Sequence, residues 1–239
     1  EKYLKKLYVR IRRISIKHII DIGVNVACGI SVEKDLINKS FKNVVCVENA
    51  IDFTRLDNVS QLSRKDFGML EDDIVLLIFG FAFERKGVDL ALKAVKSLTK
   101  TYDLKLCIVF SSNEEENRDK IVNVLGCIPD WIKFLPPNDN ISEYYNMSNV
   151  FLSPSREEGF CYAMVEATYC GCDLIASDIF GQSHANNFPY KRMVKSDSVE
   201  SLRAAIVDAI NSPITKEEVE ENRSYIYKRY SLDCWCEKM

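Results

Sequence analysis

Residues 149–177 read NVFLSPSREEGFCYAMVEATYCGCDLIAS, and this stretch decides the fold. A short apolar run, NVFL, leads into a polar loop and then into a helix-like segment from about Phe160 to Cys170. Gly171 stops that helix, and a second apolar run, DLIAS, follows at once. Two short apolar runs joined by a helical segment are typical of neighbouring parallel strands. The stretch therefore predicts a strand–helix–strand unit.

The same alternation extends in both directions. We expect further strands at 18–24, 43–47, 74–79, 104–110, 131–135 and 190–194. Expected helices lie at 32–38, 88–98, across 114–116, 141–147, 199–210 and 216–229. Strands that are apolar throughout are buried on both faces, so the fold class is α/β, a doubly wound parallel sheet with an incomplete second domain. Ligands of such sheets bind beyond the carboxyl ends of the strands, here the loops after residues 79, 110, 135, 152 and 177.

Composition excludes several classes of protein. The 239 residues are 47% hydrophobic and 28% charged with a net charge of −3, which argues against a disordered chain and against a nucleic-acid binder. No apolar run reaches the ~18 residues of a membrane span, so we expect a cytoplasmic protein. Nine cysteines accompany only His18 and His184, without zinc-ligand spacing, so neither a metal nor a disulfide role is expected. Because the chain begins with Glu1, we expect its natural start to be missing.

The first residues form a basic amphipathic pattern. Between residues 2 and 17 seven Lys or Arg side chains accompany apolar residues at spacings of three and four. This pattern predicts a helix with a charged face. It is either a surface helix of a partly absent domain or a peripheral contact with an anionic membrane face.

The loop after the expected strand at 74–79 runs from Gly80 to Gly87 and contains the adjacent cations Arg85 and Lys86. It lacks the G-x-G-x-x-G pattern of nicotinamide and flavin sites. Two cations just before a helix N-terminus favour an anion, because the free N–H groups and the helix dipole also attract negative charge. The alternative is an exposed charged pair on a solvated loop.

Two glutamates eight residues apart mark the loop and helix after NVFL. Glu158 lies at the mouth of the expected helix and Glu166 two turns inside it, about 12 Å further along at 1.5 Å per residue. That separation suits the sugar and the ribose of a nucleotide sugar, with the pyrophosphate between them at the N–H groups of Gly159, Phe160 and Cys161.

Each glutamate also has a structural alternative. Glu158 can serve as a helix cap and Glu166 as a solvated helix position. However, Ala163, Met164, Val165 and Ala167 surround Glu166. We therefore expect its carboxylate to be buried and to need a partner.

Together these motifs resemble a known family. The resemblance rests on Gly80, Arg85-Lys86-Gly87-x-Asp89, Phe134-Leu135, Ser142-Glu143-Tyr144-Tyr145, Phe151 to Phe160, Glu166-Ala167, Cys170-Gly171 and Ala176-Ser177-Asp178. In this order they resemble the retaining nucleotide-sugar glycosyltransferases of the GT-B fold with an E-x7-E signature, the family 4-like, group 1 type. Many members of that group build capsule, exopolysaccharide and lipopolysaccharide glycans. The resemblance covers nearly the whole chain.

The resemblance implies a role for each candidate residue. Glu158 contacts donor-sugar hydroxyls, and Glu166 contacts the ribose. Arg85 and Lys86 neutralise the diphosphate and, with Glu158, form the catalytic set. The remaining expected substrate-binding residues are Gly80, Phe134, Leu135, Gly159, Phe160 and Cys161, with the backbone near Phe134 and Leu135 lining the base. No metal or other cofactor is expected, because cations and helix N–H groups hold the diphosphate.

The chain departs from the family pattern at two positions. Phe81 stands where the family often has Arg, and Cys161 stands where it has Gly, which is expected to narrow the space beside the pyrophosphate. His184 is expected to be a surface or loop residue. Residues 1–50 are expected to be a remnant of the amino-terminal acceptor domain with its linker, and 51–239 the nucleotide-sugar-binding domain.

The implied activity is sugar transfer, with retention, from a nucleotide diphosphate sugar to a glycan or lipid-linked acceptor. We expect the 239 residues alone to bind a nucleotide diphosphate weakly and not to transfer sugar. Two alternatives stay open. One is a nucleotide-sugar epimerase on the same fold, although its usual His and Asp partners are not visible beside Glu158. The other is a non-catalytic nucleotide-sugar-binding subunit.

Overall fold

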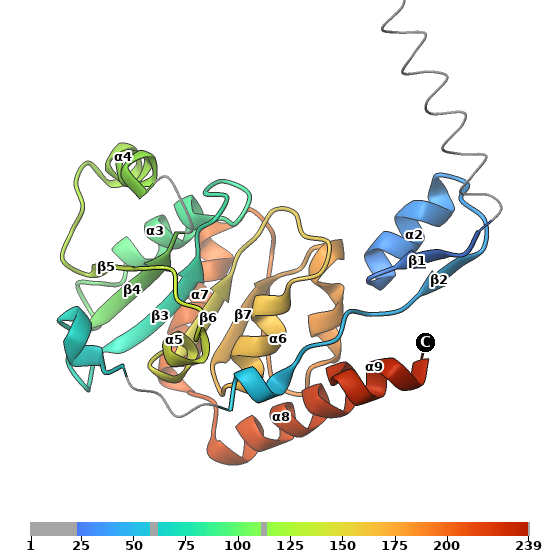
Figure 1. Ribbon diagram of the computed structural model, residues 1–239. Coiled ribbons are helices and arrows are strands. Elements are labelled where there is room, and N and C mark those ends of the chain that lie inside the picture. Colours follow the sequence, from blue (N-terminus) through green and yellow to red (C-terminus); the bar gives the residue numbers. More distant parts are fainter. Residues whose placement is uncertain (1–22, 58–61, 111–113, 239) are drawn as a thin grey trace, which may run out of the picture.

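The computed structural model describes residues 23–57, 62–110 and 114–238. It confirms the expected α/β fold class: a six-stranded, all-parallel sheet in the order β5-β4-β3-β6-β7-β8 forms its centre (Figure 1). The strands are β3 (Ile74–Phe79), β4 (Leu104–Val109), β5 (Ile132–Leu135), β6 (Val150–Ser153), β7 (Asp173–Ser177) and β8 (Arg192–Val194). Both ends of each strand lie within two residues of the ends predicted from the apolar runs.

Helices cover both faces of this sheet. One face carries α3 (Val88–Lys96), α4 (Glu114–Leu125) and α7 (Val199–Asn211). The other carries α5 (Ser142–Asn146), α6 (Tyr162–Tyr169) and α8 (Lys216–Tyr230), with α9 (Leu232–Lys238) continuing from α8 (Figure 1). Alternate residues of β3 enter opposite cores: Val75 and Leu77 pack under α5 and α6, whereas Leu76 and Ile78 pack under α3. Burial on both faces explains why this strand is apolar throughout.

The strand order reverses direction at β3. From β3 the chain builds outward through β4 to β5, and it then returns to place β6 on the other side of β3. At such a reversal the connections from the two neighbouring strands lead to helices on opposite faces of the sheet, here α3 and α6, and a crevice can form at the carboxyl ends of the strands. The loops after β3 and β6 are therefore the pair that can form a ligand site.

A smaller unit precedes this sheet. It consists of β1 (Asn25–Ala27) and β2 (Val44–Cys46), which pair in parallel, and the intervening α2 (Ile30–Asn38). The prediction of a strand at 18–24 was wrong for Gly23 and Val24, because the pairing with β2 begins at Asn25. The rest of that stretch and the basic segment 2–17 lie outside the described residues.

The connection from this unit to the large sheet contains no helix or strand between residues 47 and 50. It is attached to the end of α8 at two points. The Glu48 carboxylate lies 2.6 Å from the Arg229 guanidinium, and Ile51 forms a parallel bridge with Ser231. The 3-10 turn η1 (Phe53–Arg55) follows, capped by the Asp52 side chain. Among the described residues no helix is both long and apolar enough to cross a bilayer.

Candidate functional site: a cleft at the carboxyl ends of β3 and β6

The loops after β3 and β6 are in direct contact. The Arg156 backbone N–H donates to the Arg85 carbonyl at 2.8 Å. Gly87 has a φ of +69°, and a Cβ added there would lie 2.1 Å from the Pro154 carbonyl oxygen. Only glycine combines that backbone conformation with so close an approach. The second glycine of the β3 loop therefore lets the two loops meet.

Their contact assembles an ion cluster around Glu158. Lys86 Nζ lies 2.5 Å from Glu158 Oε1, and Ser155 Oγ donates to the same oxygen at 2.9 Å. Arg85 Nη1 lies 3.4 Å from Oε2. The Glu158 side chain is only 6% exposed, whereas that of Arg85 is 45% exposed. One buried carboxylate is thus held by two cations, and the cluster carries an excess positive charge toward solvent.

The Arg156 side chain connects the segments that carry this cluster. Its guanidinium binds both carboxylate oxygens of Asp89, at 2.7 and 2.8 Å, and also contacts Asp197 and the Glu84 carbonyl. Burial alone would raise the pKa of Asp89, but the hydrogen bonds and charge of Arg156 outweigh it and the pKa is lowered. Two-point Arg–carboxylate pairing fixes geometry as well as charge. Arg156 therefore ties α3 and the β3 loop to the loop that presents Glu158.

The cluster faces a cleft of about 560 Å³ whose opposite wall is α2. From the large sheet the cleft is lined by Arg85, Glu157, Glu158, Gly159, Phe180 and Gly181. From α2 and the residue that caps its C-terminus it is lined by Val32, Asp35 and Lys39. The expected residues Arg85, Glu158 and Gly159 are thus brought together at one cleft, with Lys86 beside them.

Glu166 lies deeper, on α6, and its carboxylate is buried as expected. Tyr145 donates its hydroxyl to Oε2 at 2.9 Å, and Arg55, from η1, pairs with Oε1. Burial raises the pKa of Tyr145 well above its usual value, and the Glu166 charge raises it further, so the hydroxyl stays a donor. These two partners, a hydrogen-bond donor and a cation, offset the free-energy cost of burying this carboxylate.

The start of α6 differs from the prediction. The helix begins at Tyr162 with Cys161 as its N-cap, so Gly159 and Phe160 belong to the preceding loop. Only the residues from Tyr162 to Glu166 contribute helical rise between the two glutamates. The 12 Å separation predicted from an eight-residue helical span therefore does not apply.

Cys161 does not narrow the cleft, contrary to expectation. Its side chain is buried, with Sγ 3.8 Å from the Ser153 hydroxyl, and it packs in the core beneath α6. Burial raises the pKa of this thiol, as expected of a core cysteine. Phe81 stacks on Phe79 with its ring centroid 5.5 Å away and is half exposed.

The other expected residues lie outside this ion cluster. Gly80 directly follows β3 and lies against the Phe110 ring, where an added Cβ would come within 2.3 Å of the ring. Phe134 and Leu135 end β5, which β4 and β3 separate from β6. The Arg118 guanidinium lies over the Phe134 ring, 3.8 Å from its centroid.

His184 was predicted to be a surface or loop residue; it is buried, so the surface position was wrong, but it does lie in the connection between β7 and β8. The turn η3 (Phe180–Asn187) folds back under the loop before α6, and the imidazole stacks on Phe160 with centroids 4.5 Å apart. Burial lowers the pKa of His184 to about 4, and the nearby Arg229 charge adds to this, whereas a hydrogen bond with the Cys161 backbone opposes it. His184 is thus a neutral support for the loop that carries Glu158.

Acidification is expected to cost stability through His184. The folded pKa is about 4 and the unfolded one about 6.5, so this contribution to stability is fully present above pH 6.5 and is lost as the pH falls toward 4, a range in which mainly the unfolded chain binds the proton. Between pH 7.5 and 4.5 the free energy of unfolding, measured with urea, should fall by about 2–3 kcal/mol less in His184→Phe than in the wild type. Equal losses in both proteins would contradict a buried neutral imidazole.

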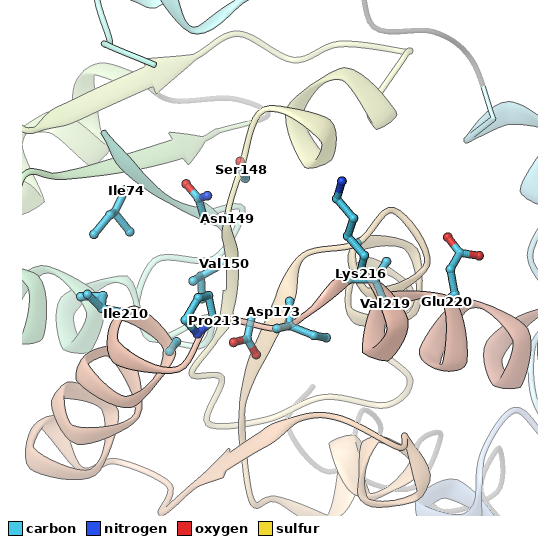
Figure 2. Close-up of a pocket in the computed structure, with 13 residues that line it drawn as sticks. Ile74, Ser148, Asn149, Val150, Asp173, Ile210, Pro213, Lys216, Val219 and Glu220 are labelled. Atoms are coloured by element: carbon cyan, nitrogen blue, oxygen red, sulfur yellow. The ribbon is translucent and has the colours of Figure 1, made fainter. Parts of the chain in front are cut away.

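A larger cavity, about 650 Å³, opens at the amino ends of the strands (Figure 2). Ile74, Val150 and Asp173 begin β3, β6 and β7 there, and Lys216 and Val219 of α8 close its other side. The crevice of a parallel sheet that binds ligands lies at the carboxyl ends, so the smaller cleft at Glu158 is the candidate site.

Sequence reasoning missed several residues of the site. Ser155 and Arg156 lay within the quoted motif, three and two residues before Glu158, and their polarity in the loop after an apolar strand was the available signal. Arg55 is 111 residues from Glu166 along the chain, and no motif in the sequence indicated that the two would pair. The charged side chains of α2 are also far from the motif along the chain. Only folding brings them opposite Glu158.

Known proteins are similar to this chain in sequence and in fold. The family described as "Glycosyl transferases group 1" matches residues 59–228. An uncharacterized glycosyltransferase of Haemophilus influenzae is 31% identical over 147 residues, which are 60% of this chain and 39% of that protein. The capsular polysaccharide biosynthesis glycosyltransferase CapM of Staphylococcus aureus is 26% identical over 189 residues, 77% of this chain and 49% of CapM. The chain thus spans half or less of the length of these two relatives.

A solved structure agrees with the fold. Anabaena Alr3699/HepE in complex with UDP-glucose superposes with a TM-score of 0.76 at 16% identity. The superposition covers 90% of this chain and 62% of that one. At this identity the likeness concerns the fold.

Proposed function

The chain belongs to the group 1 glycosyl transferase family, and on that premise we propose that the cleft between α2 and the Glu158 loop binds a nucleotide diphosphate sugar. The sugar is transferred with retention to a glycan or lipid-linked acceptor. The kinship with CapM supports a role in cell-surface polysaccharide biosynthesis. Residues 51–239 form the nucleotide-sugar-binding unit, and residues up to 50 belong to the acceptor side.

The ion cluster at Glu158 carries this proposal. Two cations on one carboxylate leave a net positive charge within this cluster, which suits a diphosphate. Glu158 Oε1 already accepts two close contacts, whereas Oε2 has, among the described residues, only the 3.4 Å contact with Arg85. Oε2 therefore retains the capacity to accept a hydrogen bond from a sugar hydroxyl. A diphosphate and a sugar ring can thus bind side by side.

The rest of the nucleotide extends from this cluster. Glu166 binds the ribose hydroxyls, since a carboxylate offers about four acceptor directions and its two partners in the chain use two of them. The base lies near the ends of β4 and β5, where Phe134 and Leu135 provide backbone groups and an apolar edge.

The reaction chemistry is mainly electrostatic. As the bond between the sugar and the diphosphate breaks, negative charge grows on the leaving phosphate, and Arg85 and Lys86 stabilise it. Glu158 orients the sugar ring through its hydroxyls. Because Arg156 and Ser155 hold this cluster in place before the ligand binds, little reorganisation is needed.

Calorimetric titration tests the proposal. UDP, GDP, UDP-glucose, UDP-galactose, UDP-N-acetylglucosamine and GDP-mannose are titrated into the protein, and the sugar nucleotides are analysed afterwards. We expect saturable binding of at least one sugar nucleotide, more tightly than of its bare diphosphate, with the sugar configuration unchanged. A changed configuration would indicate an epimerase, and absence of binding to all of the ligands would refute the proposal.

A further inference from the structure

The cleft wall opposite Glu158 is the face of α2 that carries Val32, Asp35 and Lys39. These residues are three and four positions apart, so they lie on one side of the helix. Asp35 and Lys39 form an ion pair of 2.6 Å, and their side chains are 55% and 63% exposed. The wall therefore offers an apolar side chain, a carboxylate and an ammonium group to whatever occupies the cleft.

The turn η3 sets the position of this wall relative to Glu158. Lys34 Nζ lies 5.2 Å from the centroid of the Phe180 ring, which joins α2 to η3. On its other side η3 is packed tightly against the Glu158 loop, because a Cβ on Gly181 would lie 1.7 Å from the Glu158 carbonyl oxygen. One short element thus contacts both walls, so the two sets of polar groups face a shared space of defined width.

The Glu158 cluster and the Asp35–Lys39 pair differ in their balance of charge. The Glu158 cluster has two cations for one carboxylate, which suits the diphosphate. On α2 the carboxylate of Asp35 and the ammonium of Lys39 balance each other. A charge-balanced pair next to an apolar residue suits a neutral ring whose hydroxyls both donate and accept hydrogen bonds, with its C–H face on Val32.

We propose that Asp35 and Lys39 are specificity-determining residues that bind the hydroxyls of a neutral hexopyranose ring in this cleft. The inference rests on the proposed function. The ring belongs either to the donor, as the transferred sugar, or to the acceptor, as its terminal sugar. Both sources present the same hydroxyl chemistry to α2.

The test compares affinities for a sugar nucleotide and for its bare diphosphate. The probe is the tightest-binding sugar nucleotide of the calorimetric panel, and methyl α-glucopyranoside, titrated into protein saturated with UDP, represents the acceptor. The variants are Asp35→Asn and Lys39→Ala. Lys42→Ala is the matched control, because Lys42 is an exposed lysine just after α2 that does not line the cleft.

An ion pair at this helical spacing can also serve only to stabilise the helix. The double exchange Asp35→Lys with Lys39→Asp separates the two roles, since it keeps an ion pair on the helix and reverses the positions of donor and acceptor. If the pair contacts the sugar, the exchange should bind as poorly as the single variants.

We expect Asp35→Asn and Lys39→Ala to lower affinity for the ring about three- to tenfold, with UDP affinity unchanged and Lys42→Ala like the wild type. Loss in the sugar-nucleotide titration assigns the ring to the donor, and loss only with the methyl glucoside assigns it to the acceptor. Wild-type affinity of both single variants in both titrations, or full recovery in the exchange variant, overturns this inference alone. Failure of the wild type to bind any nucleotide overturns the proposed function, and this inference with it.

Discussion

Replacing Arg85 and Lys86 together with alanine is expected to weaken UDP binding by about a hundredfold while uridine binding stays within about twofold. The two side chains supply the positive charge at the crevice where the loops after β3 and β6 meet. Hydrogen bonds to charged groups are worth roughly 1.5–3 kcal/mol each in a partly desolvated cleft. The nucleoside lacks the phosphates, so it should not sense the change.

The double variant also leaves the Glu158 carboxylate buried without its cations, which could repel a diphosphate by itself. Adding Glu158→Gln to the double variant removes that charge and serves as the control. UDP affinity that stays low in the triple variant shows that the cations act on the diphosphate. Recovery of affinity, or equal losses for UDP and uridine, would mean that the pair only neutralises Glu158.

Glu166→Gln is expected to weaken both UDP and uridine about ten- to a hundredfold, because both ligands contain the ribose. The substitution keeps the shape of the side chain and removes the charge that strengthens its hydrogen bonds to hydroxyls. The readout is calorimetric titration of the two ligands side by side. Equal losses for both distinguish a ribose contact from the diphosphate contact of Arg85 and Lys86.

Tyr145→Phe is the control for this variant. It removes the buried hydroxyl that donates to Glu166 Oε2, but it leaves the carboxylate itself in place. We expect it to lower the free energy of unfolding by about 1–2 kcal/mol and to change UDP affinity less than threefold. If Glu166→Gln destabilises the fold while binding UDP like the wild type, Glu166 is a structural residue.

Local sequence patterns predicted the elements of the large sheet because each strand is buried on both faces. Such a strand, for example Ile74–Phe79, is a continuous apolar run whose ends are visible in the sequence. The same reasoning identified Glu166 as a buried carboxylate in need of a partner. It could not identify Arg55 and Tyr145 as those partners, since they come from elements far apart along the chain.

Strand order is the main feature that the sequence did not reveal. The sequence singled out the loops that carry Arg85-Lys86 and Glu158, and the resemblance put them in one catalytic set, but only the placement of β3 beside β6 shows that Lys86 and Glu158 meet. His184 illustrates a second limit. A histidine in a polar stretch suggests a surface position, but the turn η3 folds back and buries it against Phe160.

The central claim is that Glu158 receives the sugar of a nucleotide sugar, and one ratio tests it most directly. The affinity for the tightest-binding sugar nucleotide of the panel is divided by the affinity for its bare diphosphate, in the wild type and in Glu158→Gln. The account predicts a ratio above one in the wild type that falls about tenfold or more in the variant, with affinity for the diphosphate nearly unchanged. A ratio that is the same in both proteins would contradict it.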